Sequence, residues 1–83
     1  MVMFHIYVLR SERNRKRYVG STSKSPEART HDHNNGTNNF TRQNKPWKLI
    51  YSENFMTKDE ALKREKFLKS GQGRKWLDEF IRE

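Results

Sequence analysis

Short apolar runs separated by polar segments follow one another along the chain, and their patterning predicts three strands. Residues 2–9 are rich in β-branched and aromatic side chains, which favours a strand, and Tyr18 and Val19 begin a second extended run that Gly20 closes. The polar, basic segment between these runs suits a hairpin loop, so we expect an antiparallel pair. The stretch "WKLIYSENF", residues 47–55, predicts a third strand because its side chains alternate between two faces. One face should carry Trp47, Leu49 and Tyr51, and the other Lys48, Ile50 and Ser52.

Capping residues and helical spacing predict three helices. Ser25 is a capping residue followed by a proline at the first helical position, so a short helix should span residues 26–33. Thr57 opens a capping box, and its helix should continue to about residue 70, where Gly71 and Gly73 supply a stop. The segment "NNGTNNFTRQNKP", residues 34–46, is polar and unperiodic and predicts a long loop. A final short helix should dock on the sheet through residues at helical spacing, namely Trp76, Leu77, Phe80 and Ile81.

The element order β-β-α-β-α-α predicts a small α+β fold, in which helices flank a three-stranded antiparallel sheet. The chain has 83 residues, of which 31% are hydrophobic, so it can bury only a modest core. We therefore expect a single domain over residues 1–83, without a separate recognition domain.

The charge balance indicates the class of partner. Eighteen Lys and Arg against ten Asp and Glu give a net charge of +8, whose field attracts polyanions such as nucleic acid. The apolar stretches are too short for a transmembrane helix or a signal peptide, which argues against membrane insertion and export. The chain has no cysteine, so it has neither a disulfide framework nor a thiolate metal site, and a cytoplasmic location is the simplest expectation.

Glu65 is a polar residue that packing alone does not explain. On a helix, Ala61, Leu62 and Leu68 lie within about 60° of it, so its carboxylate should project from the middle of an apolar stripe. A carboxylate that faces a core must be paired or bind a cation. Two interpretations remain open: an ion pair with Lys69, one turn further on, or a ligand for Mg²⁺, which is commonly held by one or two carboxylates.

Arg29 and His33 form a second set, because residues four apart share one face of a helix. A cation and an imidazole that point together suit an anion, although the same pair can also form a solvated polar face. His31 and His33 lie about 200° apart around a helix, which argues against a zinc ion shared by the two.

Tyr7 and Tyr18 form a third set on the two predicted neighbouring strands. Tyr7 shares its strand face with His5, and Tyr18 shares its face with Gly20, so both hydroxyls should open onto one polar surface. Taken singly, each tyrosine is explained as a structural aromatic whose hydroxyl lies at an edge.

These residues occur in an order that resembles the GIY-YIG nuclease superfamily. The matching stretches are "HIYVL", "YVG", the R and H of "EARTHDHNNG", "PWKLIY" and "EALKREKFLK", which together span residues 5 to about 75. Within the superfamily, the chain is most similar to the small stand-alone branch that resembles the amino-terminal nuclease domain of the bacterial nucleotide-excision repair incision enzyme.

The resemblance implies a three-stranded antiparallel sheet with flanking helices and the hydrolysis of phosphodiester bonds in nucleic acid, assisted by one divalent ion, Mg²⁺ or Mn²⁺. DNA is expected more than RNA, no membrane is involved, and a larger repair or recombination assembly is a further expected partner. The resemblance assigns the catalytic positions to Tyr7, Tyr18, Arg29, His33 and Glu65, with Glu65 as the metal ligand.

The chemistry of phosphodiester hydrolysis accounts for this set. The reaction needs an activated water and groups that stabilise the charge growing on the phosphoryl and leaving oxygens. Positive charge from the metal and Arg29 should favour the phenolate, so that Tyr7 serves as general base. Tyr18 and His33 would orient water and substrate, and Arg29 would hold the phosphate. Which tyrosine takes the proton stays open.

The chain departs from the motifs at three points. His5 stands where the first motif has glycine, which adds an imidazole on the Tyr7 face that could tune or block activity. Val19 replaces an isoleucine in the second motif. The asparagine that family nucleases usually carry towards the carboxyl end has no convincing counterpart after Glu65.

Basic residues near the candidate site are expected to hold the nucleic-acid backbone, so that any cutting is weakly sequence-specific and guided by shape. They are Arg13, Arg15, Lys16, Arg17, Arg42 and Lys45.

Two other functions remain open. A non-catalytic nucleic-acid-binding module on the same fold explains these cations and those of the predicted helix after Thr57, but it does not explain Glu65. A small basic protein that lodges on a larger assembly needs none of the five residues to converge. The helix cations in question are Lys58, Lys63, Arg64, Lys66 and Lys69.

Overall fold

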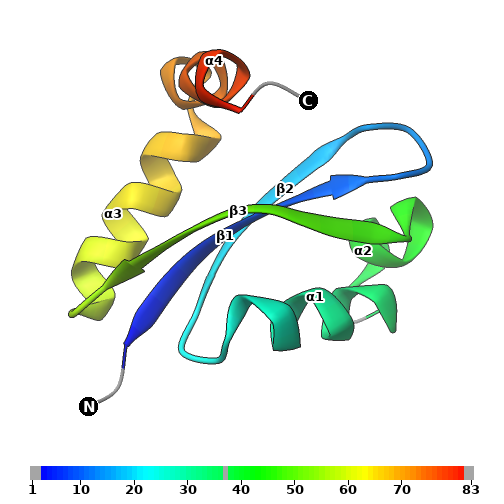
Figure 1. Ribbon diagram of the computed structural model, residues 1–83, viewed down its shortest axis with the longest axis horizontal. Coiled ribbons are helices and arrows are strands. Elements are labelled where there is room, and N and C mark those ends of the chain that lie inside the picture. Colours follow the sequence, from blue (N-terminus) through cyan, green and yellow to red (C-terminus); the bar gives the residue numbers. More distant parts are fainter. Residues whose placement is uncertain (1–2, 37, 82–83) are drawn as a thin grey trace.

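In the computed structural model, which describes residues 3–36 and 38–81, a three-stranded sheet lies between two pairs of helices (Figure 1). The predicted α+β class and antiparallel sheet are confirmed, while Val2 of the predicted first strand lies outside the described residues. The strands are β1 (Phe4–Ser11), β2 (Arg17–Thr22) and β3 (Trp47–Phe55), and the helices are α1 (Pro26–Asn34), α2 (Asn39–Asn44), α3 (Lys58–Lys69) and α4 (Gly71–Phe80). None of these helices is both long and apolar enough to cross a membrane.

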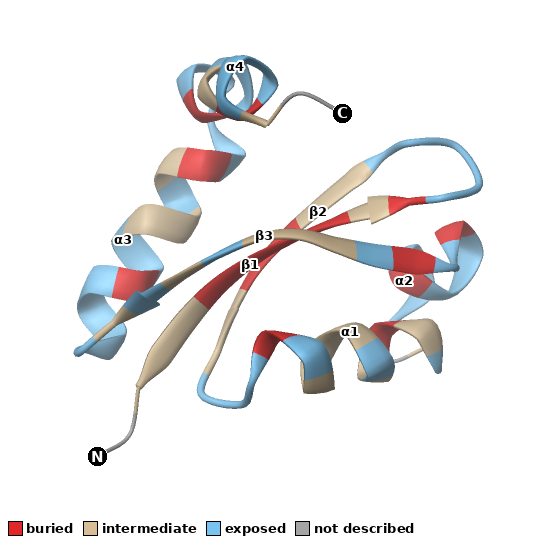
Figure 2. Ribbon diagram, in the orientation of Figure 1, coloured by how far each residue is buried: buried red, intermediate tan, exposed pale blue. Residues whose placement is uncertain are grey.

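The central strand β1 supplies the core on both faces of the sheet. The strand order is β2-β1-β3, with both pairs antiparallel, and residues 6–9 of β1 are fully buried (Figure 2). Ile6 and Val8 pack beneath α3 and α4 with Ala61, Leu68 and Leu77, whereas Tyr7 and Leu9 face the side of α1 with Trp47. Because side chains alternate along a strand, Tyr7 lies on the face of the sheet that points away from the main core.

Strand β3 contains a bulge that breaks the predicted alternation. Val8 pairs with Tyr51 and Leu9 pairs with Leu49, so that Ile50 is an extra residue between the two pairs. Trp47 and Leu49 lie on the α1 side, but Tyr51 packs with the α3 and α4 core. The prediction that Trp47, Leu49 and Tyr51 share a face was therefore wrong.

The segment predicted as a long loop contains helix α2. Its first turn is closed by a capping box, in which Asn38 and Thr41 exchange side-chain to backbone hydrogen bonds. Thr41 is fully buried, and its carbonyl accepts a 2.8 Å hydrogen bond from the indole nitrogen of Trp47. The helix is held by its cap and by contacts to β3 and has no apolar stripe of its own, so periodicity could not predict it.

Gly71 and Gly73 do not form a loop after α3 but lie in the first turn of α4. Ser70 ends α3 and also caps α4, where its hydroxyl accepts a hydrogen bond from the Gly73 amide at 3.2 Å. A Cβ atom at position 73 would lie 1.9 Å from the carbonyl oxygen of Phe67, so only glycine allows the two helices to pack this closely. Gly73 permits a sharp change of direction between adjacent helices, which explains why this segment resembled a helix stop.

The final helix docks on the core as predicted, but only some of the apolar residues predicted for this contact take part in it. Leu77 is buried, and Trp76 and Ile81 pack against the same core. Phe80 is 60% exposed, and its ring lies parallel to that of Trp76 at 4.7 Å.

Candidate active site

Tyr7 and His33 form the centre of the candidate site. Tyr7 lies on the central strand and His33 in the last turn of α1, and the two side chains are 1% and 0% exposed as residues. The Tyr7 hydroxyl lies 2.9 Å from Nε2 of His33. The site is therefore a buried hydrogen bond between a phenol and an imidazole that are 26 residues apart in the chain.

Gly20 makes this position of Tyr7 possible. It pairs with Tyr7 in the register of β1 and β2, and a Cβ atom at position 20 would lie 2.4 Å from the Tyr7 hydroxyl oxygen. The phenol ring therefore crosses β2 at the one residue without a side chain. Gly20 was predicted to end the second strand, but β2 continues to Thr22. A glycine inside a strand is the signal that indicates such a close approach.

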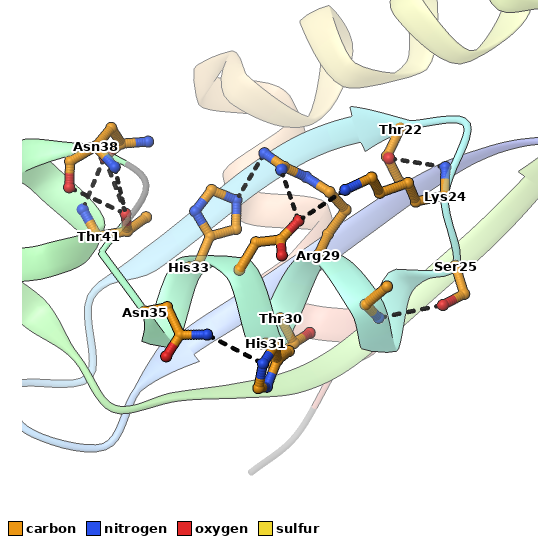
Figure 3. Close-up of polar contacts among 12 residues, drawn as sticks. Thr22, Lys24, Ser25, Arg29, Thr30, His31, His33, Asn35, Asn38 and Thr41 are labelled. Atoms are coloured by element: carbon orange, nitrogen blue, oxygen red, sulfur yellow. Dashed lines mark hydrogen bonds and ion pairs between the residues drawn. The ribbon is translucent and has the colours of Figure 1, made fainter.

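Arg29 lies one turn before His33 on the same face of α1, as predicted. Figure 3 shows its guanidinium beside the His33 ring, where Nη2 lies 3.4 Å from Nε2. The Asp32 carboxylate accepts a 3.1 Å hydrogen bond from Nη1 of the same guanidinium. It also forms a 3.3 Å ion pair with Nζ of Lys24. Because a guanidinium can only donate, Nε2 of His33 is an acceptor and the ring proton lies on Nδ1. The Tyr7 hydroxyl therefore donates its proton towards His33.

Burial sets the protonation states of this pair. Burial is the main cause that raises the pKa of Tyr7, and the charge of Glu65 and the nearby Tyr18 add to it, while Arg29 lowers it. The pKa of His33 is lowered, first by burial and then by the positive charge of Arg29, with Asp32 opposing. Near neutral pH the pair is thus a phenol and a neutral imidazole. Arg29 acts in the expected direction, but burial outweighs it, so the pKa of Tyr7 is raised overall.

Tyr18 lies beside the pair in an aromatic cluster. Its ring centroid is 4.7 Å from that of His33 and 6.3 Å from that of Tyr7. It also contacts the rings of Phe40 at 6.0 Å and Trp47 at 6.3 Å. The structure therefore brings four of the five predicted residues together on the α1 side: Tyr7, Tyr18, Arg29 and His33.

Glu65 approaches the same edge of the sheet from the other side, on α3. Its Oε1 accepts a hydrogen bond from Ser21 at 2.7 Å, and its Oε2 pairs with Lys69 at 2.7 Å. Ser21 follows Gly20 on β2, so the carboxylate lies next to the point where the Tyr7 ring crosses that strand. Of the two interpretations of Glu65, an ion pair with Lys69 or a metal ligand, the structure contains the ion pair.

The surroundings of Glu65 correct one prediction. Leu62 is 44% exposed, so the buried stripe of α3 runs through Ala61 and Leu68 and Glu65 lies at its border. The carboxylate is 19% exposed and reaches water at the sheet edge. Ser21 is a site residue that sequence reasoning missed, because a serine in a strand carries no distinguishing pattern.

His5, the imidazole that replaces the glycine of the first motif, is held away from the site. Its Nδ1 lies 2.6 Å from the side-chain oxygen of Asn54 on β3. The Tyr7 ring lies over β2, on the opposite side of β1. His5 thus leans towards one neighbouring strand and Tyr7 towards the other.

The predicted nucleic-acid contacts form one surface beside the site. The turn between β1 and β2 is fastened to α2, since Arg13 donates to the Gln43 carbonyl at 3.0 Å and Asn14 donates to the Asn44 side chain at 2.6 Å. This places the two groups of cations next to each other, as Figure 1 shows for the turn and α2. Within this set Arg17 is half-buried and paired with Asp78, and the exposed members are Arg13, Arg15, Lys16, Arg42 and Lys45.

The cations of α3 have mixed roles. Arg64 pairs with Glu53 through two hydrogen bonds of 2.9 and 3.0 Å and lies over the ring of Trp76 at 4.6 Å. It therefore stabilises the packing of α3, β3 and α4 and is not available to a ligand. The exposed cations of this helix are Lys58, Lys63, Lys66 and Lys69.

The sequence of this chain matches one known family. The model of the GIY-YIG catalytic domain matches residues 3–76, which include every residue of the candidate site. No curated protein sequence matches the chain significantly. The matched domain is of a nuclease type that acts on nucleic acid. The chain belongs to the GIY-YIG family.

Proposed function

We propose that this protein is an endonuclease that hydrolyses phosphodiester bonds of DNA with the help of one divalent metal ion. The observation that carries the proposal is the Tyr7 to His33 hydrogen bond of 2.9 Å at the Gly20 crossing, with Glu65 held on the neighbouring Ser21. A buried phenol, a neutral imidazole and a carboxylate at one sheet edge have no evident packing purpose together. They supply the proton acceptors and the charge that hydrolysis requires.

The states of Tyr7 and His33 favour a proton relay. As the water oxygen bonds to phosphorus, its proton passes to the Tyr7 oxygen while the phenolic proton passes to Nε2 of His33. The bond between phosphorus and the leaving oxygen breaks, and that oxygen takes a proton from solvent. Tyr7 is thus never a free phenolate, which suits a group whose pKa is raised by burial. Arg29 donates hydrogen bonds to the phosphoryl oxygens.

The residues at the sheet edge suit a single Mg²⁺ or Mn²⁺ ion. Glu65 would be its protein ligand, because each carboxylate oxygen keeps a lone pair beyond the bonds to Ser21 and Lys69. The described residues contain no group of three His, Cys, Asp or Glu able to hold a metal, so water and substrate phosphate would complete the shell. When bound, such an ion supplies Lewis-acid stabilisation of the charge that develops on phosphate oxygens.

The substrate is proposed to be recognised by backbone charge and shape more than by sequence. The net charge of +8 and the basic surface beside the site favour phosphate contacts, which carry no sequence information. The similarity of the motifs to the nucleotide-excision repair incision enzyme supports DNA over RNA and a role within a repair or recombination assembly in the cytoplasm.

A non-catalytic nucleic-acid-binding module is the second candidate, and one observation favours it. Both oxygens of Glu65 are already engaged, by Ser21 and by Lys69. A carboxylate satisfied in this way also serves to fasten α3 to β2, with no metal involved.

A cleavage assay separates the two candidates. End-labelled single-stranded, duplex and branched DNA are incubated with the protein and Mg²⁺ or Mn²⁺, beside a chelator control and the variant Glu65→Gln. Cutting that requires both the metal and Glu65 supports the endonuclease. Binding without cutting, unchanged by the metal or by the variant, supports the binding module.

A further inference from the structure

A groove of about 690 Å³ runs along the outer edge of β2, next to the candidate active site. Its volume lies in the range of about 300–1,000 Å³ that is typical of sites for small organic groups. Two residues belong to both the groove and the site: Tyr18, beside His33, and Lys69, which pairs with Glu65. A group bound in the groove would therefore lie next to the reacting phosphate.

Phe40 gives the groove an aromatic wall. It is 39% exposed on α2, and its ring is stacked on that of Tyr18 at 6.0 Å with an angle of 28° between the planes. The ring of Trp47, which does not line the groove, packs against it at 5.7 Å. The next residue, Thr41, is fully buried, so α2 presents Phe40 outward from an anchored position. Such an aromatic face is a platform on which a flat ring can stack.

The charges and the floor of the groove suit a nucleotide. Lys16 and Arg74 line it and make no ion pair within the described part of the chain, and no lining residue is acidic. Leu68 and Leu77, which belong to the buried core, lie beneath it as an apolar floor. An apolar floor and an aromatic wall accept a base, whereas the cations at the rim accept the phosphates on either side of it.

We propose that this groove binds one unpaired nucleotide next to the scissile phosphate, with its base stacked on Phe40 and its phosphates held by Lys16 and Arg74. The proposal rests on the proposed function, because it names the class of nucleic acid that the site acts on. A base inside a duplex is stacked on its neighbours and cannot enter the groove. The preferred substrate is therefore DNA with an unpaired base, such as a bulge, a gap or a single-stranded segment.

The test measures stacking directly and without cleavage. A duplex that carries the fluorescent base 2-aminopurine, either in a one-base bulge or fully paired, is titrated with the protein in the presence of a chelator. The expected result is quenching of the bulged base and tighter binding of the bulged duplex. Phe40→Leu should weaken binding of the bulged duplex about tenfold and abolish the quenching, because leucine fills space but has no aromatic face. Phe40→Trp should retain both.

The matched control is Phe80→Leu, which alters an exposed phenylalanine on α4 outside the groove and should change neither signal. Thermal unfolding verifies that each variant is folded, and Phe40→Trp keeps the test valid if Phe40→Leu is unstable. Equal affinity for bulged and paired DNA, or quenching that survives Phe40→Leu in a folded protein, would overturn the proposal. Stacking without metal-dependent cutting would support the groove proposal and contradict the proposed nuclease function. Equal metal-dependent cutting of all DNA shapes would support the nuclease function and contradict the groove proposal.

Discussion

The ring of Tyr7 lies across Gly20 so closely that a single methyl group at position 20 would meet its hydroxyl oxygen at 2.4 Å. The two residues are direct partners in the register of β1 and β2. This relationship explains why the candidate site places a tyrosine directly opposite a glycine. The glycine lets the phenol reach the sheet edge, where His33 receives its hydrogen bond.

Gly20→Ala should therefore displace the Tyr7 ring and lower cleavage at least about a hundredfold, with a loss of about 1–3 kcal/mol in the free energy of unfolding. Cleavage rates and chemical denaturation measure the two effects. Gly71→Ala is the matched control, because a Cβ atom there has no neighbour within 4 Å. If Gly20→Ala cleaves as fast as the unchanged protein, the crossing does not position Tyr7.

The state of His33 predicts how activity depends on pH. The relay needs a neutral His33, and its pKa is lowered from the ordinary value of 6.5. The cleavage rate should therefore stay constant as the pH falls past 6.5 and decrease only at lower pH. A pH–rate profile tests this expectation, with the exposed His31→Gln as a control variant. A decrease that is centred above pH 6.5 would contradict the neutral, buried imidazole.

The same shift predicts a pH dependence of stability. Because the folded pKa of His33 is depressed, the unfolded chain binds more protons below pH 6.5 than the folded protein does. The free energy of unfolding should therefore fall as the pH decreases through the range between the two pKa values. His33→Gln should flatten this part of the stability curve, measured by denaturation at several pH values, and an unchanged slope would argue against the assignment.

Lys69 competes for the carboxylate that is proposed to hold the metal. Its ammonium lies 2.7 Å from Oε2 of Glu65, so removing it frees that oxygen. Lys69→Gln should tighten Mn²⁺ binding a few-fold, measured by electron paramagnetic resonance without substrate, whereas Glu65→Gln should abolish it. Lys66→Gln is the matched control on the exposed face of α3. Equal Mn²⁺ affinity in all three variants would show that Glu65 is not the ligand.

The sequence predicted most of the fold where local patterns are strong. The strand alternation of β1, the Ser25 and Thr57 caps and the spacing in α4 each correspond to an element that is present. The errors occur where tertiary contacts determine the local structure. Helix α2 depends on its cap and on the indole of Trp47, and the β3 bulge depends on the register with β1.

The candidate site was predictable by residue type but not by geometry. Arg29 and His33 could be selected because residues four apart share a helix face, and the resemblance to the GIY-YIG family assigned Tyr7 to the same site. The structure joins the three residues. The pKa of Tyr7 could not be predicted, because its burial depends on how α1 and the aromatic cluster cover it. The contact of Ser21 with Glu65 joins residues 44 positions apart, and no sequence pattern indicates it.

The central claim is that the hydroxyl of Tyr7 transfers the proton from the attacking water to His33. The most direct test is the single-turnover cleavage of labelled DNA by Tyr7→Phe, which removes one oxygen and keeps the ring over Gly20. Tyr51→Phe is the matched control, since that hydroxyl contacts Glu53 on the other face of the sheet. We predict a loss of at least about a hundredfold for Tyr7→Phe in a folded protein, and little change for Tyr51→Phe. Cleavage by Tyr7→Phe at the rate of the unchanged protein would contradict the relay.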